Sequence, residues 1–153
     1  MTGFEIFYEH EFNTKWKVTS MLEYLWNQQL SGSSSSDFPL PFSPPINAFF
    51  EMTYVTNSTG RFKNIELYVN TNLVAKQDRI AQNEEVTPGY EIFGAGLRST
   101  LSLGKFRANI NLQAFNIFDT KYFNHTNFYR ALEIPEMGRN IQLMISIPLF
   151  NNA

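Results

Sequence analysis

The sequence predicts an all-β fold, an antiparallel meander of about seven long strands. Three observations support this prediction. Apolar and polar residues alternate along most of the chain, which is the period of a strand with one apolar and one polar face. Each alternating run is about as long as a tilted strand that crosses a bilayer, ~9–11 residues. The connections between runs are short and long in turn, which is typical of a membrane barrel with tight turns on one rim and extended loops on the other.

The first two predicted strands are 3–12 and 16–28, joined by a tight turn at 13–15. The second strand places Trp16 and Trp26 on the same apolar face. The ten residue steps between them span roughly 23 Å at ~3.3 Å per residue and ~45° tilt, close to the height of an outer-membrane apolar band. We therefore expect Trp16 and Trp26 to be membrane-interface aromatics on a lipid-facing surface. A long strand of a soluble sandwich is the alternative.

A Ser- and Pro-rich segment, 30–45, separates these strands from the next pair and is expected to be an exposed loop. Strands at 46–56 and 62–76 then follow, with a turn at 57–60 between them. The polar face of the latter strand would line a wet lumen or face solvent on a half-exposed sheet. The face consists of Asn64, Glu66, Tyr68, Asn70 and Asn72, and the lumen-lining candidates are Glu66, Asn70 and Asn72.

The last part of the chain contains two longer polar connections, 77–89 and 118–138, the second being the longest of all. Gly94 and Gly96 remove side chains from one face of a strand, which suits sharp sheet curvature or the close approach of a plug inside a barrel. The remaining predicted strands are 90–102, 105–117 and 139–150.

Composition excludes several classes of function. The net charge of −2 argues against a basic nucleic-acid surface, so we expect no nucleic-acid partner. Cysteine is absent, which leaves no disulfide and no thiolate metal site. His10 and His125 lie in unlike contexts, and His125, flanked by Asn and Thr, is expected to form loop hydrogen bonds rather than bind metal. Glu84 and its neighbour Glu85 are expected to be solvated charges. With no phosphate loop or nucleophile motif, we predict neither an enzyme nor a cofactor or metal site.

Three motifs in the second half of the chain resemble those of a known family. The run 116–122, NIFDTKY, is similar to the N-L-F-D/N-x-x-Y signature near the end of TonB-dependent outer-membrane receptors. Asn124-His125, Ile134-Pro135-Glu136 and Gly138-Arg139-Asn140 resemble the run before the last barrel strand in the Bacteroidetes branch. Residues 75–79 and 87–90 resemble an A-x-Q-x-R…T-P-G-Y loop of the same branch. The resemblance covers residues 60–150 through motifs and residues 3–57 through strand pattern only.

The resemblance implies a segment of a large outer-membrane β-barrel, the last third of a 22-stranded receptor with a plugged lumen. Such receptors sit in the Gram-negative outer membrane and import a scarce nutrient such as a ferric siderophore, vitamin B12 or an oligosaccharide. The implied partners are outer-membrane lipid, the nutrient and the rest of the receptor. Met1-Thr2-Gly3 leads directly into a strand pattern, so we expect 1–153 to be a C-terminal piece without signal peptide or plug. The TonB complex would then act only through that missing plug.

The resemblance also suggests roles for single residues. Phe150 occupies the place of the family's C-terminal aromatic assembly signal, although Asn151-Asn152-Ala153 follow it. Arginines and aromatics of the predicted outer loops can hold an anionic aromatic ligand by ion pairing and stacking. The expected ligand contacts are Arg79, Tyr122, His125, Phe128, Tyr129, Arg130 and Arg139.

Two alternatives remain at this point. The first is a soluble β-barrel or sandwich that binds a ligand, which requires strands packed around an apolar inside. The second is a membrane-embedded structural protein that transports nothing. The loop residues also allow a purely structural role without ligand contact. In that case salt bridges among the charged side chains would hold the loop, the candidates being Asp119, Glu133, Glu136 and Arg139.

Overall fold

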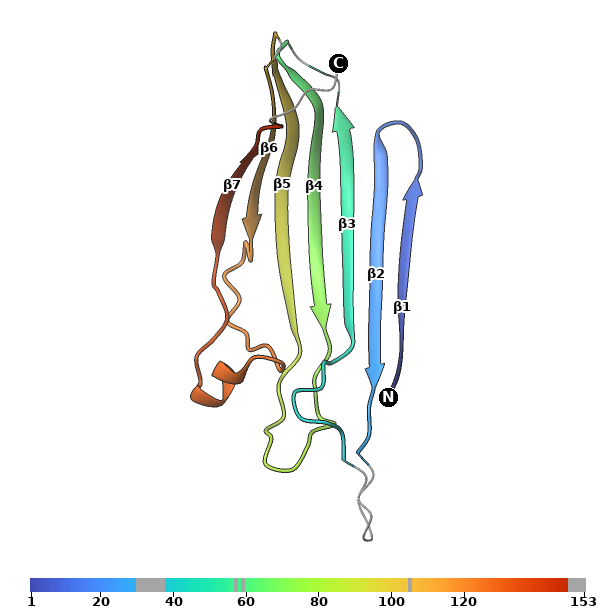
Figure 1. Ribbon diagram of the computed structural model, residues 1–153, viewed down its shortest axis with the longest axis vertical. Helices are drawn as coiled ribbons and strands as arrows, with labels where there is room; N and C mark the ends of the chain where they lie inside the picture. Colours follow the sequence, from blue (N-terminus) through green and yellow to red (C-terminus); the bar gives the residue numbers. More distant parts are fainter. Residues whose placement is uncertain (30–37, 57, 59, 105, 149–153) are drawn as a thin grey trace.

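A computed structural model describes residues 1–29, 38–56, 58, 60–104 and 106–148 of the chain. It is all-β: seven strands form one antiparallel sheet in chain order, which confirms the predicted meander (Figure 1). One short 3-10 helix, η1 (Phe128–Leu132), lies in the last long loop. The strands are β1 (Thr2–Glu11), β2 (Trp16–Trp26), β3 (Asn47–Thr56), β4 (Phe62–Val74), β5 (Tyr90–Leu103), β6 (Phe106–Phe115) and β7 (Asn140–Ser146).

The connections sort by length to the two ends of the sheet. Figure 1 shows the three short turns at its top and the three long loops at its bottom. We name these the β2–β3 loop (27–46), the β4–β5 loop (75–89) and the β6–β7 loop (116–139). The Ser33 to Ser36 stretch of the first loop, and Phe150, lie outside the described residues.

Every strand contributes apolar side chains to the same face of the sheet. The register aligns Trp16 with a continuous row of residues on that face, namely Tyr54, Leu67, Leu97, Leu112 and Leu143. The next row lies on the opposite face and is mainly polar: Lys17, Thr53, Tyr68, Gly96, Gln113 and Gln142. The sheet is therefore a single wall whose two faces differ in chemistry.

The apolar face of this wall is uncovered. Among the described residues the buried apolar side chains are few, and large ones such as Val69 and Leu143 are 57% and 62% exposed. A soluble sandwich would pack such a face against a second layer, and the described part of the chain has no second layer. No helix among the described residues is long and apolar enough to cross a membrane.

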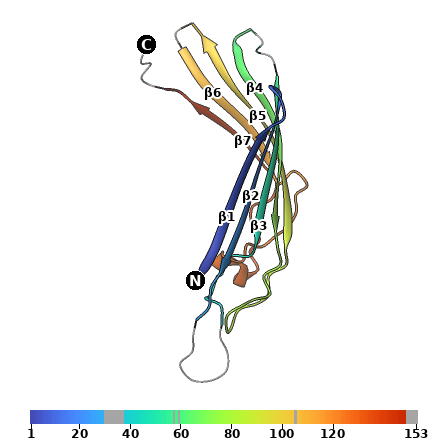
Figure 2. The ribbon, with the colours of Figure 1, turned by 90° about the vertical axis from the view of Figure 1, so that its right-hand side faces the viewer.

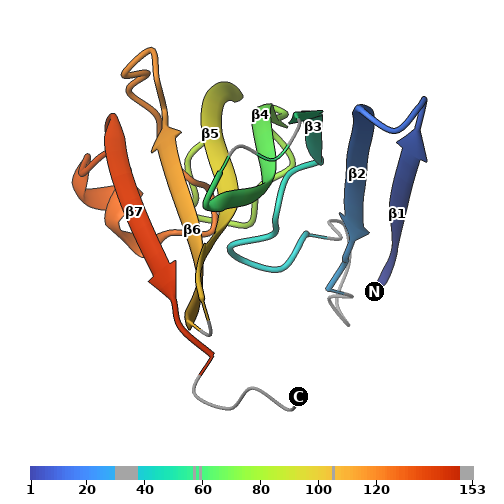
Figure 3. The same cartoon turned by 90° about the horizontal axis from the view of Figure 1, so that it is seen from above.

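The wall is twisted and curved, as the views from the side and from above show (Figures 2 and 3). In Figure 3 the described second part of the β2–β3 loop, 38–46, lies on the concave side of the arc formed by the strands. Two prolines of that loop, Pro44 and Pro45, line a cavity together with polar-face residues. The polar face is therefore the concave one.

A β-bulge in β4 changes which residues face outward. The register shifts between Lys63 and Glu66, and Asn64 adopts a left-handed conformation with φ of 50°. Two residues of β4 then oppose one residue of β5, so the alternation of the two faces is shifted by one residue at the bulge. As a result Phe62, which precedes the bulge, lies on the same apolar face as Leu67, which follows it. The bulge thus keeps both ends of a long strand apolar on the same side.

Gly94 and Gly96 make room for side chains of the neighbouring strand. A Cβ atom on Gly96 would collide with the Tyr68 ring, and one on Gly94 would collide with the Asn70 amide. The sequence had suggested curvature or a plug as the reason for these glycines. In the described structure, the space belongs to Tyr68 and Asn70.

Several elements are shorter than the residue patterns suggested. β2 ends at Trp26 rather than near 28, because the Asn27 side chain accepts the Leu40 N–H and begins the loop. β7 ends at Ser146 rather than near 150, and Pro148, which has no N–H to donate to a ladder, follows closely.

Candidate ligand site at the loop end of the sheet

Arg98 organises the middle of the polar face. Its guanidinium binds both carboxylate oxygens of Glu51, at 2.9 and 3.0 Å, and lies 3.8 Å from Glu66. It also stacks over the Tyr68 ring, 3.9 Å from the centroid. The Tyr68 hydroxyl lies 3.2 Å from Asn111 Oδ1, its hydrogen-bond acceptor. These contacts give the concave face a charged, hydrogen-bonded surface rather than an apolar one.

The three long loops meet at Glu84. Its Oε1 accepts the Phe42 N–H of the β2–β3 loop at 2.8 Å, and its Oε2 accepts the Ala81 N–H of its own loop at 2.9 Å. Arg130 of the β6–β7 loop donates to the same Oε1 at 3.3 Å. The Glu84 side chain is 9% exposed. The prediction that Glu84 is a solvated charge was therefore wrong, because its carboxylate is the acceptor that joins three loops.

His125 is the most buried member of this group, which we call the Glu84 cluster (Glu84, Thr87, His125 and Arg130). Its Nδ1 lies 2.8 Å from Thr87 Oγ1, and its buried Nε2 lies 3.7 Å from Glu84 without a hydrogen-bond partner. A neutral ring that accepts the Thr87 hydroxyl at Nδ1 carries its proton on Nε2, facing the carboxylate. Arg130 also donates to the carbonyl oxygens of His125 and Glu85, at 3.0 and 3.1 Å.

The cluster shifts the titration of its two central groups. Burial raises the pKa of Glu84, but the amides of Phe42 and Ala81 and the charges beside it outweigh burial and leave that pKa lowered. Burial lowers the pKa of His125, and the Arg130 guanidinium lowers it further against the opposing effect of Glu84. A charged carboxylate and a neutral imidazole are thus the favoured states at neutral pH.

A second set of contacts joins the first two loops. Gln77 exchanges backbone hydrogen bonds with Thr87, and its side chain donates to the Ser43 carbonyl at 2.8 Å. Asn27 Oδ1 accepts from the Ser43 hydroxyl at 2.9 Å. Arg79 donates to the Asn27 carbonyl at 2.5 Å and stacks over the Trp26 ring, 3.4 Å from its centroid. The loops are thus held by polar contacts rather than by an apolar core.

The β6–β7 loop is shaped by two residues of the run 116–122. Fully buried Asn116 binds both backbone groups of Thr120, through its Nδ2 at 2.9 Å and its Oδ1 at 2.8 Å. Asp119 accepts the Arg139 N–H at 2.8 Å, which fastens the end of the loop to its beginning. Both Asn116 and Asp119 have positive φ, a conformation that Asn and Asp tolerate. The side chains of this motif therefore serve loop geometry.

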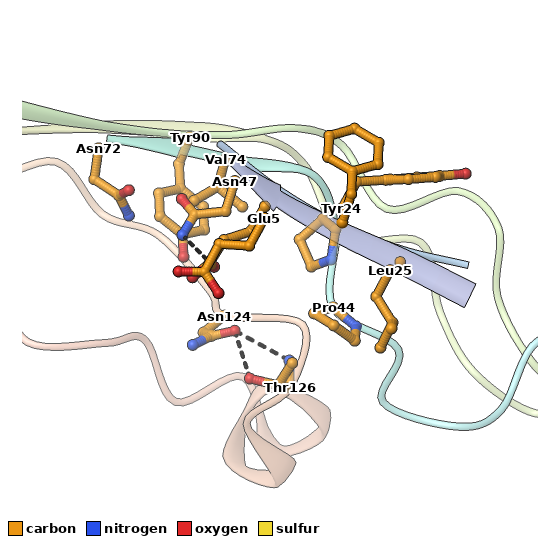
Figure 4. A pocket seen from close by; sticks show the side chains of 14 residues that line it. Glu5, Tyr24, Leu25, Pro44, Asn47, Asn72, Val74, Tyr90, Asn124 and Thr126 are labelled. Atoms are coloured by element: carbon orange, nitrogen blue, oxygen red, sulfur yellow. Dashed lines mark hydrogen bonds between the residues drawn. The ribbon is translucent and has the colours of Figure 1, made fainter. Parts of the chain in front are cut away.

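A cavity of about 650 Å³ lies between the polar face and these loops. Figure 4 shows Glu5, Asn47, Asn72 and Tyr90 on the strands facing the loop residues Pro44, Asn124 and Thr126. Glu23 also lines the cavity, and its carboxylate accepts a hydrogen bond from Asn47 Nδ2 at 3.3 Å. The cavity is open, combines apolar, amide and carboxylate side chains, and lies at the loop end of the wall.

The structure divides the predicted ligand residues into two groups. Four already have partners within the protein. Arg79 contacts Asn27 and Trp26, and Arg130 contacts Glu84 and two loop carbonyls. His125 is 1% exposed, and the Tyr122 ring packs on the Tyr90 ring with 4.4 Å between centroids. The other three are exposed on the β6–β7 loop. They are Phe128 at 65%, Tyr129 at 58% and Arg139.

The acidic residues of the β6–β7 loop hold it through neutral groups. Glu136 accepts from the Asn127 amide at 2.6 Å, and Glu133 ends η1 in a left-handed conformation. Arg139 contributes its backbone N–H to Asp119. None of the ion pairs among the described residues joins Asp119, Glu133, Glu136 and Arg139 to one another.

No family model matches the chain, and no curated protein matches it. Solved structures do match it. A structure of the copper transporter OprC superimposes with a TM-score of 0.72 at 26% sequence identity. The match covers 95% of this chain and 22% of that one, so the chain spans about a fifth of the transporter's length.

This likeness supports an outer-membrane receptor-like barrel for the chain, and with it an outer-membrane location. It does not support the Bacteroidetes type in particular, nor siderophore or iron transport. The match is to a transporter rather than an enzyme, which fits a protein without catalytic activity. Among the described residues, no group of three or more His, Cys, Asp or Glu could hold a metal ion.

Three important residues were missed from the sequence. From the sequence, Glu84 is predicted to be a solvated charge, and neither Glu5 nor Glu23 is singled out. Glu84 gave no local signal, since its partners lie as far away as Phe42 and Arg130. The pairing of Glu5 with Glu23 was accessible, because the turn at 12–15 fixes the register of β1 on β2.

Proposed function

We propose that this chain forms part of the wall of an outer-membrane transport barrel of the TonB-dependent type. The observation that carries the proposal is the chemistry of the two faces. A continuous apolar row from Trp16 to Leu143 is suited to lipid, and the parallel row from Lys17 to Gln142 is suited to a wet lumen. Trp16 and Trp26, 38% and 43% exposed, flank the apolar face of β2 as interface aromatics would.

In this proposal the chain is the C-terminal barrel segment of a longer receptor. The remaining strands and a plug would complete the barrel, and the TonB complex would act through that plug. The end with the long loops would face the outside, and Phe150 would serve as the assembly signal. The Bacteroidetes type rests on the loop motifs alone.

The transported substrate is a scarce nutrient captured at the loop end. The sequence resemblance alone favours a ferric siderophore, vitamin B12 or an oligosaccharide, and the likeness to OprC supports none of these over another. Copper is the cargo named for OprC, and soft Cys, Met or His ligands would be needed to hold it. Because the chain spans about a fifth of that transporter, we do not extend copper transport to this chain.

The orientation of the wall can be tested by placing the same charge on either face at the same depth. Leu22→Arg would put a charge on the apolar face between the two tryptophans. At ~2.3 Å of membrane depth per tilted residue, the charge would lie about 9 Å from the depth of Trp26 and about 14 Å from that of Trp16. We expect it to reduce the stability of the folded state by about 2–4 kcal/mol in a bilayer. Met21→Arg, the matched control, would point into the lumen and cost little.

The measurement is the midpoint of unfolding, in lipid vesicles, of a complete receptor that carries this chain. Equal losses for Leu22→Arg and Met21→Arg would contradict the assignment of the faces. A soluble ligand-binding module is separated by a simpler observation, since it would stay monodisperse in buffer without detergent. A structural membrane protein would pass both tests and fail to support nutrient uptake in a complete receptor.

A further inference from the structure

His125 is buried between two of the long loops, and its polar contacts suit a neutral ring. The side chain is 1% exposed and extends from the β6–β7 loop to Thr87 of the β4–β5 loop, with 2.8 Å between Nδ1 and Oγ1. Because Nε2 faces the Glu84 carboxylate, the proton of the neutral ring lies there and Nδ1 accepts the Thr87 hydroxyl. A second proton, on Nδ1, would bring two donors face to face until the Thr87 hydroxyl turned away. The contact that joins the two loops here therefore favours the neutral imidazole.

The charged groups around His125 come from both loops and act in opposite directions. Glu84 lies 3.7 Å from His125 Nε2 and favours a charged ring. Arg130 opposes this, since its guanidinium lies 3.3 Å from the same carboxylate oxygen and pairs with it. The described part of the β2–β3 loop contains no charged residue. Three exposed charged residues line an open pocket beside Arg130, where water screens them: Glu85, Lys121 and Glu133. A positive charge on His125 would therefore share a carboxylate that Arg130 already neutralises.

A change of charge on His125 would reach the whole loop arrangement and the cavity beside it. Glu84 and Arg130, its two charged neighbours, make the hydrogen bonds that join the three long loops. The residues on either side of His125 in the chain, Asn124 and Thr126, line the cavity at the loop end (Figure 4). If the β6–β7 loop left its place, both residues would leave the cavity wall with it.

We propose that His125 is a proton-operated latch: its neutral ring closes the β6–β7 loop on the β4–β5 loop, and protonation of the ring releases it. The proposal rests on the proposed function only for its setting, in which these loops surround the outer mouth of a transport barrel. There, a ligand held between the strands and the loops would be bound at neutral pH and released in acid. The latch itself is a property of the loops of this chain.

The direction of the effect follows from the two states of the loops. Burial, and next the Arg130 guanidinium, lower the pKa of His125 while the loops are closed. In open loops the ring is solvated and regains its ordinary pKa of 6.5. The open loops therefore take up a proton that the closed loops do not, so closure is fully stable above this value and weakens as the pH falls below it.

The test is amide hydrogen exchange in a complete receptor that carries this chain, compared at about pH 7.5 and about pH 5 after correction for intrinsic exchange rates. The opening equilibrium constant of the β4–β5 and β6–β7 loops should rise by up to about 30-fold over this range. That limit applies to a ring that titrates at 6.5 in open loops and stays neutral in closed ones. Glu84, with an ordinary pKa of 4.5 and a lowered one in the closed loops, contributes little above pH 5.

Two variants separate His125 from other titrating groups. His125→Asn keeps an oxygen that can accept the Thr87 hydroxyl but cannot take up a proton in this range, so the pH dependence of opening should disappear. His10→Asn is the matched control, because His10 is the other histidine of the chain and lies exposed on β1. This variant should keep the full pH dependence.

Exchange of the imidazole C2 proton follows His125 directly in the unmodified receptor, so it gives an answer even if His125→Asn leaves the loops open at both pH values. We expect the ring to titrate below 6.5 there. Equal loop opening at the two pH values in the unmodified receptor would overturn the proposal. So would a pH dependence that survives His125→Asn, or a ring that titrates at 6.5 or above. The face test on Leu22 and Met21 involves no loop residue, so the two proposals fail separately.

Discussion

Replacing Glu84 by alanine should loosen all three long loops at once. The substitution removes the acceptor of the Phe42 and Ala81 amides and the carboxylate partner of Arg130, whose side chain is 9% exposed. Hydrogen bonds to a charged group contribute about 1.5–3 kcal/mol each, and these contributions do not simply add. Arg130 keeps two carbonyl acceptors, which limits the cost of its lost carboxylate.

We therefore expect a loss of about 3–5 kcal/mol in the free energy of loop opening, in the range found for breaking one partner of a buried ion pair. This corresponds to a rise in the opening equilibrium constant of roughly 10²- to 10³-fold or more. The assay is amide hydrogen exchange on the chain in detergent micelles, followed separately in each loop. Glu85→Ala is the matched control, because Glu85 is exposed and offers Arg130 only its carbonyl.

Exchange that rises only in the β4–β5 loop would show that Glu84 stabilises its own loop and does not join the three. Exchange no faster than in Glu85→Ala would show that the buried carboxylate contributes nothing to loop closure. The strands provide an internal standard, since their ladders should exchange equally slowly in all variants.

Three further predictions concern other parts of the molecule. Loop closure should weaken as the pH falls: open loops take up protons first on His125, from its ordinary pKa of 6.5 downward, and then on Glu84 from 4.5. Intrinsic-rate-corrected hydrogen exchange should show this, and pH-independent closure would contradict it. Gly96→Ala should lower the unfolding midpoint in vesicles, because the added Cβ atom would displace the Tyr68 ring. Alanine at Gly60 would meet no neighbouring atom, so its effect should be limited to the backbone strain caused by a φ of 55°. In a complete receptor, Phe128→Ala with Tyr129→Ala should reduce nutrient uptake without affecting assembly, and normal uptake would return these aromatics to a passive role.

The strands and their faces could be predicted because the signal for them is local. Alternation with period two is visible in any short window, and a tight turn fixes the register of a hairpin. The same logic placed Trp16 and Trp26 on the apolar face of β2. What the pattern missed were interruptions of the period, such as the bulge at Asn64 that brings Phe62 to the apolar face.

The loop contacts could not be predicted because their signal is distant in sequence. Glu84 binds Phe42 and Arg130 across separations of 42 and 46 residues, and nothing beside it distinguishes it from exposed Glu85. Spacing in the sequence also cannot tell a residue that contacts ligand from one that shapes a loop. Asn116 belongs to the motif that suggested the family, and the structure gives it a role in loop geometry.

A single-layer wall has no apolar interior in which to bury its loops, so this chain orders them with buried polar groups instead. Such a network is stable only while its members are paired, which makes the loop arrangement specific and cooperative. One side of the cavity at the loop end comes from the same loops: Pro44 belongs to the loop that Glu84 holds through Phe42, and Thr126 adjoins His125 of the Glu84 cluster. A ligand that touches both the strands and these loops therefore binds the closed arrangement more tightly than the open one. By thermodynamic linkage, a pH at which Glu84 is charged and His125 is neutral stabilises the closed loops and thereby raises the affinity of such a ligand.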